Sequence, residues 1–194
     1  MVGSLWIVFA FLCGSLPLSV WLGRVALGVD ITQYGDGNPG ATNVWRAGGG
    51  KWGVLAVLLD FFKGAIPVGL ANFVFGLDGW QLAAVAVAPI LGHAFSPFMG
   101  FRGGKALAVT FGIWAGLSLF LIPIILGMFF GLFLWLLKPE GWAVMAGAAS
   151  LLAALIAYFP EPVWLGAWAG MTLILAWKHR DDLRQKPQLR SRGH

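Results

Sequence analysis

The sequence predicts an all-α, polytopic membrane protein with seven transmembrane segments, an outside N-terminus and a cytoplasmic C-terminus. Hydrophobic residues make up 59% of the 194 residues and charged residues only 11%, against roughly 25% charged residues in a soluble domain. Apolar runs of about 20 residues, the length that spans a bilayer, recur along the chain. The net charge of +5 is concentrated in alternate connections and in the tail, which indicates membrane topology rather than nucleic-acid binding.

The first predicted segment covers residues 5–27. Pro17 predicts a kink there, because proline removes a backbone donor and clashes with the preceding turn. Ser15 can bond to backbone groups that the kink frees. The second segment covers residues 52–75 and the third covers residues 80–98. No basic residue precedes the first apolar run, so the N-terminus does not resemble a cleaved signal peptide.

An uncharged run at residues 106–137 is too long for one crossing of the membrane. A straight helix of that length would measure roughly 48 Å, whereas the hydrocarbon core of a bilayer is ~30 Å thick. We therefore expect two segments, the fourth of the chain being short, with a break near Gly116 and Ser118. The last two predicted segments cover residues 142–158 and 163–177.

The distribution of basic residues sets the predicted orientation. The C-terminal tail and the loops around Arg46 and Lys105 are basic, whereas the turns at Asp78 and Glu161 contain no Lys or Arg. Basic loops face the cytoplasm. Because Lys105 and the tail are then on the same side of the membrane, an even number of crossings must join them. This again requires the uncharged run to form two membrane crossings.

The longest polar stretch, residues 34–46, is rich in groups that donate hydrogen bonds. Its glycines permit positive φ angles, so the loop can wrap around a phosphate-sized anion. The donors are the backbone amides of Gly35, Gly37 and Gly40 and the side chains of Asn38, Thr42, Asn43 and Arg46.

A second polar loop ends in Gly103, Gly104 and Lys105, and His93 precedes it in the sequence. It is not a P-loop, because Ala106 stands where that motif has Ser or Thr. Taken alone, the loop fits a cytoplasmic turn with basic residues equally well. Beside the first loop, it favours an anion site built from two sides.

Charged residues also occur inside and at the end of the apolar segments. Asp60 and Lys63 have i,i+3 spacing and can form an internal salt bridge that orients the second helix. A proton or ion pathway is the alternative. Lys178 is predicted to be a snorkelling anchor, and its neighbour His179 to belong to the site. Cys13, the only cysteine, can form no internal disulfide and is expected to pack as a small core residue.

These polar blocks, in their order and spacing over about residues 3–182, resemble the acyl-phosphate-dependent glycerol-3-phosphate acyltransferase family (PlsY) of bacterial inner membranes. The glycine-asparagine block is highly specific to that family. The resemblance rests on Gly14-Ser15-Leu16-Pro17, Gly37-Asn38-Pro39-Gly40-Ala41-Thr42-Asn43, Leu59-Asp60-Phe61-Phe62-Lys63-Gly64, Phe101-Arg102-Gly103-Gly104-Lys105 and His179-Arg180.

The resemblance implies one membrane-embedded acyltransferase domain at residues 1–182, a basic cytoplasmic tail at residues 183–194, and motifs that face the cytoplasm. It implies transfer of an acyl group from acyl phosphate to glycerol 3-phosphate, which gives lysophosphatidate and phosphate in the first step of bacterial phospholipid synthesis. The expected partners are these two substrates and membrane lipids. No cofactor, metal ion or nucleic acid is expected.

The first loop's amides are expected to hold the donor phosphate, and Arg46, Lys105 and His179 the phosphate of the acceptor. The candidate catalytic residues are Asp36, Arg46, Lys105 and His179. The candidate substrate-binding residues are Gly37, Asn38, Gly40, Thr42, Asn43, His93, Gly103, Gly104 and Asp182.

Several positions depart from the family pattern. Asp36 replaces a serine, Asp182 an asparagine and Ala106 a glycine, and a serine pair of the family has no counterpart at residues 141–144. An ionised carboxylate donates no hydrogen bond. The two acids should therefore weaken binding of a doubly anionic acceptor unless Arg or Lys neutralises them. Asp36 is also a candidate base, because a carboxylate can accept a proton.

Two other classes of protein remain open from the sequence. A degenerate paralogue could bind anionic lipid or phosphate as a non-catalytic scaffold or regulator, and the two substituted acids favour it. A transporter would need a polar path through the bilayer, for which only Asp60 and Lys63 are clearly charged at depth.

Overall fold

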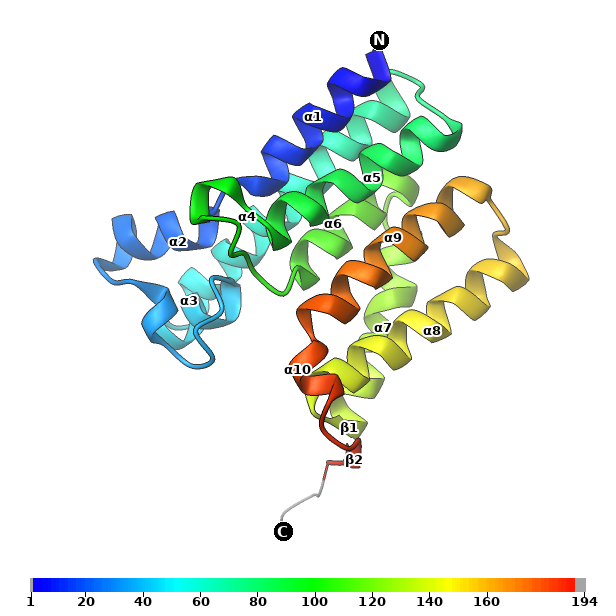
Figure 1. Cartoon of the computed structure of the whole chain (residues 1–194). Helices are drawn as coiled ribbons and strands as arrows, with labels where there is room; N and C mark the ends of the chain where they lie inside the picture. Colours follow the sequence, from blue (N-terminus) through cyan, green and yellow to red (C-terminus); the bar gives the residue numbers. More distant parts are fainter. Residues whose placement is uncertain (1, 191–194) are drawn as a thin grey trace.

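The computed structural model describes residues 2–190, and α-helices dominate its regular structure (Figure 1). The elements are α1 (Val2–Ser15), α2 (Leu18–Leu22), η1 (Gly23–Leu27), η2 (Ile31–Gln33), α3 (Ala41–Gly48), α4 (Gly50–Gly69), η3 (Leu70–Val74), α5 (Gly79–Ala94), η4 (Pro97–Met99), α6 (Leu107–Ser118), α7 (Leu121–Leu136), β1 (Leu137–Lys138), α8 (Glu140–Tyr158), α9 (Pro162–Lys178), α10 (Arg180–Leu183) and β2 (Gln188–Leu189).

Within residues 2–190, four helical runs are long and apolar enough to cross a membrane by length and composition: Val2–Leu27, Gly50–Val74, Gly79–Met99 and Glu140–Tyr158. The first is interrupted at Pro17, as the kink prediction requires. The uncharged run forms two shorter apolar helices, α6 and α7, which separate at residues 119–120. The break therefore lies within a few residues of the predicted one, just after Ser118.

Glycines let the central helices approach one another closely. A Cβ atom on Gly14 of α1 would collide with the backbone of Pro89 in α5, and one on Gly92 of α5 would collide with the Phe11 carbonyl of α1. Gly112 of α6 lies in the same way against the backbone of α4. Small residues at such contacts are how helices pack in lipid, where apolar burial supplies little attraction between them.

A buried ion pair ties α4 to the kink at Pro17. Lys63 Nζ lies 2.9 Å from Asp60 Oδ1 and donates to the Leu16 carbonyl at 2.9 Å. Ser19 Oγ donates to Asp60 Oδ2 at 2.8 Å. The predicted internal salt bridge is confirmed, and it also satisfies a backbone carbonyl beside the proline.

The polar loops collect at one end of the bundle (Figure 1). The N-terminus and the turn between α4 and α5 lie at the opposite end from α3, α10 and the paired strands. β1 and β2 are antiparallel, with Leu137 opposite Leu189. This arrangement brings segments from the first half of the chain next to its C-terminal part.

Candidate active site

The loop before α3 is organised by the buried side chain of Asn43. Its Nδ2 donates to the Asn38 carbonyl at 2.9 Å and to Asp36 Oδ1 at 3.1 Å, while its Oδ1 accepts from Arg46 Nη1 at 2.8 Å. Gly35 has φ +57°, and a Cβ there would collide with Arg46 Nη1. Both ends of the Asn43 amide are thus hydrogen-bonded within residues 36–46, and the role of Asn43 in substrate binding stays a prediction.

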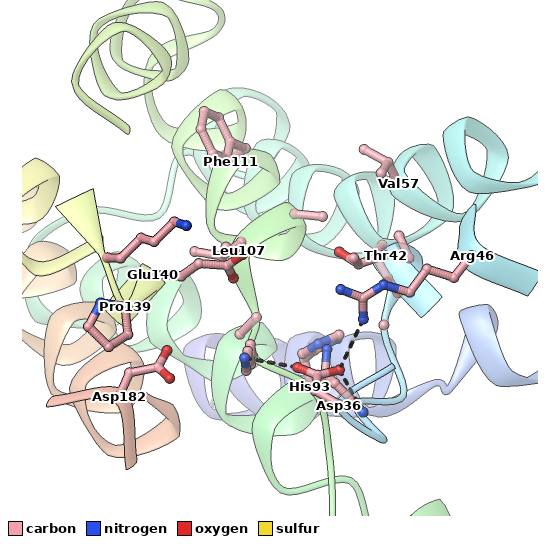
Figure 2. A pocket seen from close by; sticks show the side chains of 18 of the residues that line it. Asp36, Thr42, Arg46, Val57, His93, Leu107, Phe111, Pro139, Glu140 and Asp182 are labelled. Atoms are coloured by element: carbon pink, nitrogen blue, oxygen red, sulfur yellow. Dashed lines mark hydrogen bonds and ion pairs between the residues drawn. The ribbon is translucent and has the colours of Figure 1, made fainter. Parts of the chain in front are cut away.

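Asp36 joins the two polar loops. Its Oδ2 lies 2.9 Å from Lys105 Nζ, and its Oδ1 lies 3.8 Å from Arg46 Nη1; Figure 2 shows Asp36 and Arg46 turned toward one another. Partial burial alone would raise the pKa of Asp36, but the hydrogen bonds from Lys105, the Asn38 backbone and Asn43 and the charge of Lys105 outweigh it and lower that pKa. Burial likewise opposes the charge of Lys105, and Asp36 outweighs it and raises the pKa of Lys105. Both groups are therefore charged at neutral pH, and the new acid is neutralised.

This pair predicts a pH-dependent contribution to stability. The pKa of Asp36 is lowered from 3.8, so its contribution is present above that pH and is lost as the pH falls through the folded-state pKa. The pKa of Lys105 is raised from 10.5, so its contribution is present below that pH and is lost as the pH rises further. The thermal midpoint of wild type minus that of Asp36→Asn should be positive and constant between these limits and should shrink in acid. A difference that persists unchanged in strong acid would contradict the ion pair as its cause.

The second polar loop is held against the end of α5. Gly104 N donates to the His93 carbonyl at 3.2 Å, and a Cβ on Gly104 would collide with His93 Nε2. Lys178 donates to the Gly103 carbonyl at 2.8 Å and to the Ala94 carbonyl at 3.3 Å. Ala106, where the family has glycine, adopts φ +67°, a left-handed conformation that costs an ordinary residue roughly 1–2 kcal/mol.

His179 and Asp182 lie where α9, α10 and α8 meet. His179 is buried; burial lowers its pKa, while the hydrogen bond to the Leu175 carbonyl opposes that effect. That bond places Nδ1 at 2.9 Å from the carbonyl, so neutral Nδ1–H donates, and Nε2 has no hydrogen-bond partner within residues 2–190. Asp182 Oδ2 accepts from Gly141 N at 3.0 Å. The second substituted acid is thus placed at the N-terminus of α8, where a negative charge is favourable.

A cavity of about 920 Å³ opens between these elements. Of the residues proposed from the sequence, those that line it are Asp36, Asn38, Gly40, Thr42, Arg46, His93, Lys105 and Asp182. Those that are not part of the described lining are Gly37, Asn43, Gly103, Gly104 and His179. Asn43 and Gly104 position lining residues, because they contact Asp36, Arg46 and His93 directly.

The cavity has an apolar side that sequence reasoning did not identify. Val57 of α4 and Leu107, Ala108 and Phe111 of α6 line it, and Figure 2 shows Val57 and Phe111 across the cavity from Asp36 and His93. These side chains lie within long apolar segments, so nothing in the sequence distinguishes them from residues that face lipid.

The C-terminal segment also lines the cavity, and this was missed from the sequence. Lys138, Glu140, Lys186 and Arg190 all belong to the lining. Lys186 and Arg190 were interpreted only as signals of topology, and Lys138 was given no role. The contact that places them, two residue pairs between β1 and β2, is too short to leave a sequence pattern.

Comparison with known proteins places this architecture in a family. The family model described as "Glycerol-3-phosphate acyltransferase" matches residues 4–186. Glycerol-3-phosphate acyltransferase 1 of Thermotoga maritima is 37% identical over 199 residues, which cover 95% of this chain and 98% of that protein. The glycerol-3-phosphate acyltransferase of Aquifex aeolicus is 35% identical and covers 92% of each chain.

Solved structures agree with the sequence relatives. The crystal structure of PlsY (YgiH), an integral membrane glycerol 3-phosphate acyltransferase, in its glycerol 3-phosphate form superposes with a TM-score of 0.84 at 32% identity, covering 95% of this chain and 91% of that one. Its lysophosphatidic acid form superposes with a TM-score of 0.83 at 30% identity.

The fold and the cavity together define an integral membrane protein of the helical class, with a polar site that combines cationic and apolar walls. The family match covers nearly the whole chain, including both polar loops and the α9–α10 junction. The chain belongs to the glycerol-3-phosphate acyltransferase family, and the resemblance read from its motifs is confirmed.

Proposed function

We propose that this protein transfers an acyl group from acyl phosphate to the hydroxyl of glycerol 3-phosphate. The observation that carries the proposal is the two-sided cavity. Its polar side offers Asn38, Thr42, Arg46 and Lys105, and its apolar side offers Val57 and Phe111. A donor with a phosphate head and an acyl chain needs both sides at once, and a phosphate-bearing acceptor needs the cations.

The donor phosphate would bind at the N-terminus of α3. Gly40, Ala41 and Thr42 line the cavity at that point, and a helix N-terminus presents unpaired backbone amides and a partial positive charge. The acyl chain would lie along Val57 and Phe111. The phosphate of glycerol 3-phosphate would bind to Arg46 and Lys105.

The reaction needs no covalent intermediate on the protein. The acceptor oxygen attacks the acyl carbonyl carbon, the bond from that carbon to the phosphate oxygen breaks, and inorganic phosphate leaves. Acyl phosphate is already activated, so positioning and charge stabilisation supply most of the catalysis. The hydroxyl proton passes to a phosphate oxygen or a histidine. The lowered pKa of Asp36 makes it a weak base, and its role becomes charge balance for Lys105 and Arg46.

The positions of the two substituted acids support the enzyme over the non-catalytic scaffold. The scaffold alternative depended on Asp36 and Asp182 repelling a dianionic acceptor. Asp36 is paired with Lys105 at 2.9 Å, and Asp182 accepts a hydrogen bond at the start of α8. Neither carboxylate is left uncompensated at the site.

We further propose seven membrane crossings in the bacterial inner membrane, with the N-terminus outside and the cavity facing the cytoplasm. Residues 1–182 form the catalytic domain, and residues 183–194 are cytoplasmic. Labelling of single cysteines in intact cells tests this, in a background that carries Cys13→Ala. Glu161→Cys should react with an impermeant maleimide, and Arg184→Cys should react only after lysis; the reverse pattern would contradict the orientation.

The catalytic proposal is tested by phosphate release from palmitoyl phosphate by the purified protein. We expect release that depends on added glycerol 3-phosphate. No release from wild type, together with a gain of activity in Asp36→Ser/Asp182→Asn, would instead indicate a fold retained after the chemistry was lost.

A further inference from the structure

The C-terminal segment is fastened across the cavity by backbone and side-chain hydrogen bonds. Arg190 N donates to the Leu136 carbonyl at 2.8 Å, next to the β1–β2 pairing. Trp142 Nε1 donates to the Gln185 carbonyl at 2.8 Å. We call residues 185–190 together with β1 the C-terminal strap. Its last residues, 187–190, lie beyond the range matched by the family model.

The strap brings three cations into the cavity lining: Lys138, Lys186 and Arg190. No salt bridge to any of them occurs within residues 2–190. All three are exposed to solvent. The other two Lys or Arg residues of the described lining, Arg46 and Lys105, share the carboxylate of Asp36.

Charge balance makes the strap cations significant. The proposed reaction brings two phosphate groups into one cavity, and a phosphate monoester carries about −1.5 to −2 charges at neutral pH. We call the side of the cavity formed by the two polar loops the loop side. There, the negative charge of Asp36 offsets one of the two positive charges of Arg46 and Lys105, which leaves a single positive charge. That single charge does not balance the two phosphates, so further cations in the cavity lining would favour binding of both substrates.

The two acids on the strap side, Asp182 and Glu140, offset two of its three cations, so the strap side also keeps a net positive charge. Asp182 is bonded to Gly141 N, and Glu140 stands in the first turn of α8, where the helix N-terminus stabilises negative charge. Lys105 feels the charges of both Asp182 and Glu140. Lys105 therefore interacts with charged groups on both the loop side and the strap side of the cavity.

We propose that Lys138, Lys186 and Arg190 form a second phosphate-binding subsite, which acts with Arg46 and Lys105 to hold the phosphate of the water-soluble acceptor. This proposal rests on the proposed acyl transfer and names the residues that complete its acceptor site. The exposure of the three cations suits a substrate that arrives from water. The donor phosphate is then held at the N-terminus of α3, as proposed above.

The test compares two triple variants that each remove three positive charges. The strap variant is Lys138→Gln/Lys186→Gln/Arg190→Gln. The matched control is Arg24→Gln/Lys51→Gln/Arg184→Gln, whose residues are exposed and lie outside the described cavity lining. Both are assayed with palmitoyl phosphate and glycerol 3-phosphate at several salt concentrations, and both are checked for folding by thermal unfolding.

We expect the strap variant to raise the KM for glycerol 3-phosphate by about tenfold or more, and to change the KM for palmitoyl phosphate little. The dependence of the acceptor KM on salt should also weaken, because screened charge attraction has been removed. The control should resemble wild type. Single Gln variants with smaller effects in the same direction guard against misfolding of the triple variant.

Three results would overturn the subsite: an unchanged KM for glycerol 3-phosphate in a folded, active strap variant, an equal effect in the control, or a selective effect on the donor. Absence of acceptor-dependent turnover in wild type is a different failure, since it would reject the acyl transfer itself.

Discussion

Lys105→Ala is expected to raise the KM for glycerol 3-phosphate and to lower kcat/KM about 100-fold. The substitution removes a cation that lines the cavity and leaves Asp36, 43% exposed at its side chain, without its 2.9 Å partner. A hydrogen bond between charged groups contributes roughly 2–3 kcal/mol, and each 1.4 kcal/mol is a factor of ten. The site thus loses a positive charge that attracts the acceptor phosphate, and it is left with an unpaired negative charge that repels it. Steady-state kinetics with varied acceptor measure this directly.

A second variant separates the two parts of that effect. In Lys105→Ala/Asp36→Ala the repelling carboxylate is also gone, so activity should recover about tenfold relative to Lys105→Ala alone. Lys51→Ala, an exposed cation outside the described lining, serves as the control. Near-normal kinetics in Lys105→Ala would remove Lys105 from the acceptor site, and no recovery in the double variant would show that Asp36 does not act through charge.

Lys63→Met is expected to lower the free energy of unfolding by roughly 3–5 kcal/mol, the usual cost of removing one partner from a buried ion pair. Lys63 and Asp60 are almost completely buried, at 4% and 3% exposure of their side chains. Without Lys63, the Asp60 carboxylate keeps only the Ser19 hydroxyl, and the Leu16 carbonyl beside Pro17 loses one of its two donors and keeps Leu18 N. Thermal unfolding in detergent measures the loss.

Removing both charges should restore much of that stability. Replacing a buried pair by apolar residues of similar size is often neutral, so Lys63→Met/Asp60→Leu should unfold at a higher temperature than Lys63→Met. A Lys63→Met protein as stable as wild type would argue against the orienting salt bridge and would favour the alternative of a proton or ion pathway through the second helix.

Much of the fold follows from the sequence because its signals are strong over long stretches. Apolar runs, Pro17 and the length of the uncharged run predicted the helices and their breaks. Asp60 and Lys63 could be paired from spacing alone, since i,i+3 positions share one face of a helix. The positions of His179 and Asp182 relative to α8 could not be predicted, because they depend on how α8, α9 and α10 pack.

The residue types of the site could be predicted from the sequence, but the role of each residue could be predicted less well. The donors of the first loop and Lys105 were identified, and the structure brings them together through Asp36. A spacing rule does not reveal that Asn43 bonds to the Asn38 carbonyl, because that bond depends on the conformation of the loop. It also does not reveal that Lys178 bonds to the Gly103 carbonyl, because that bond depends on a tertiary contact. The strap was missed for the same reason: Lys186 and Arg190 look like any basic tail until β2 pairs with β1.

The most direct measurement of the central claim is the stoichiometry of the reaction. Purified protein is given palmitoyl phosphate and radiolabelled glycerol 3-phosphate, and the labelled lipid and the released phosphate are counted together. Acyl transfer predicts one labelled 1-acylglycerol 3-phosphate for each phosphate released, with both products lost together in Lys105→Ala. Phosphate release without labelled lipid, or binding of both substrates without either product, would contradict it.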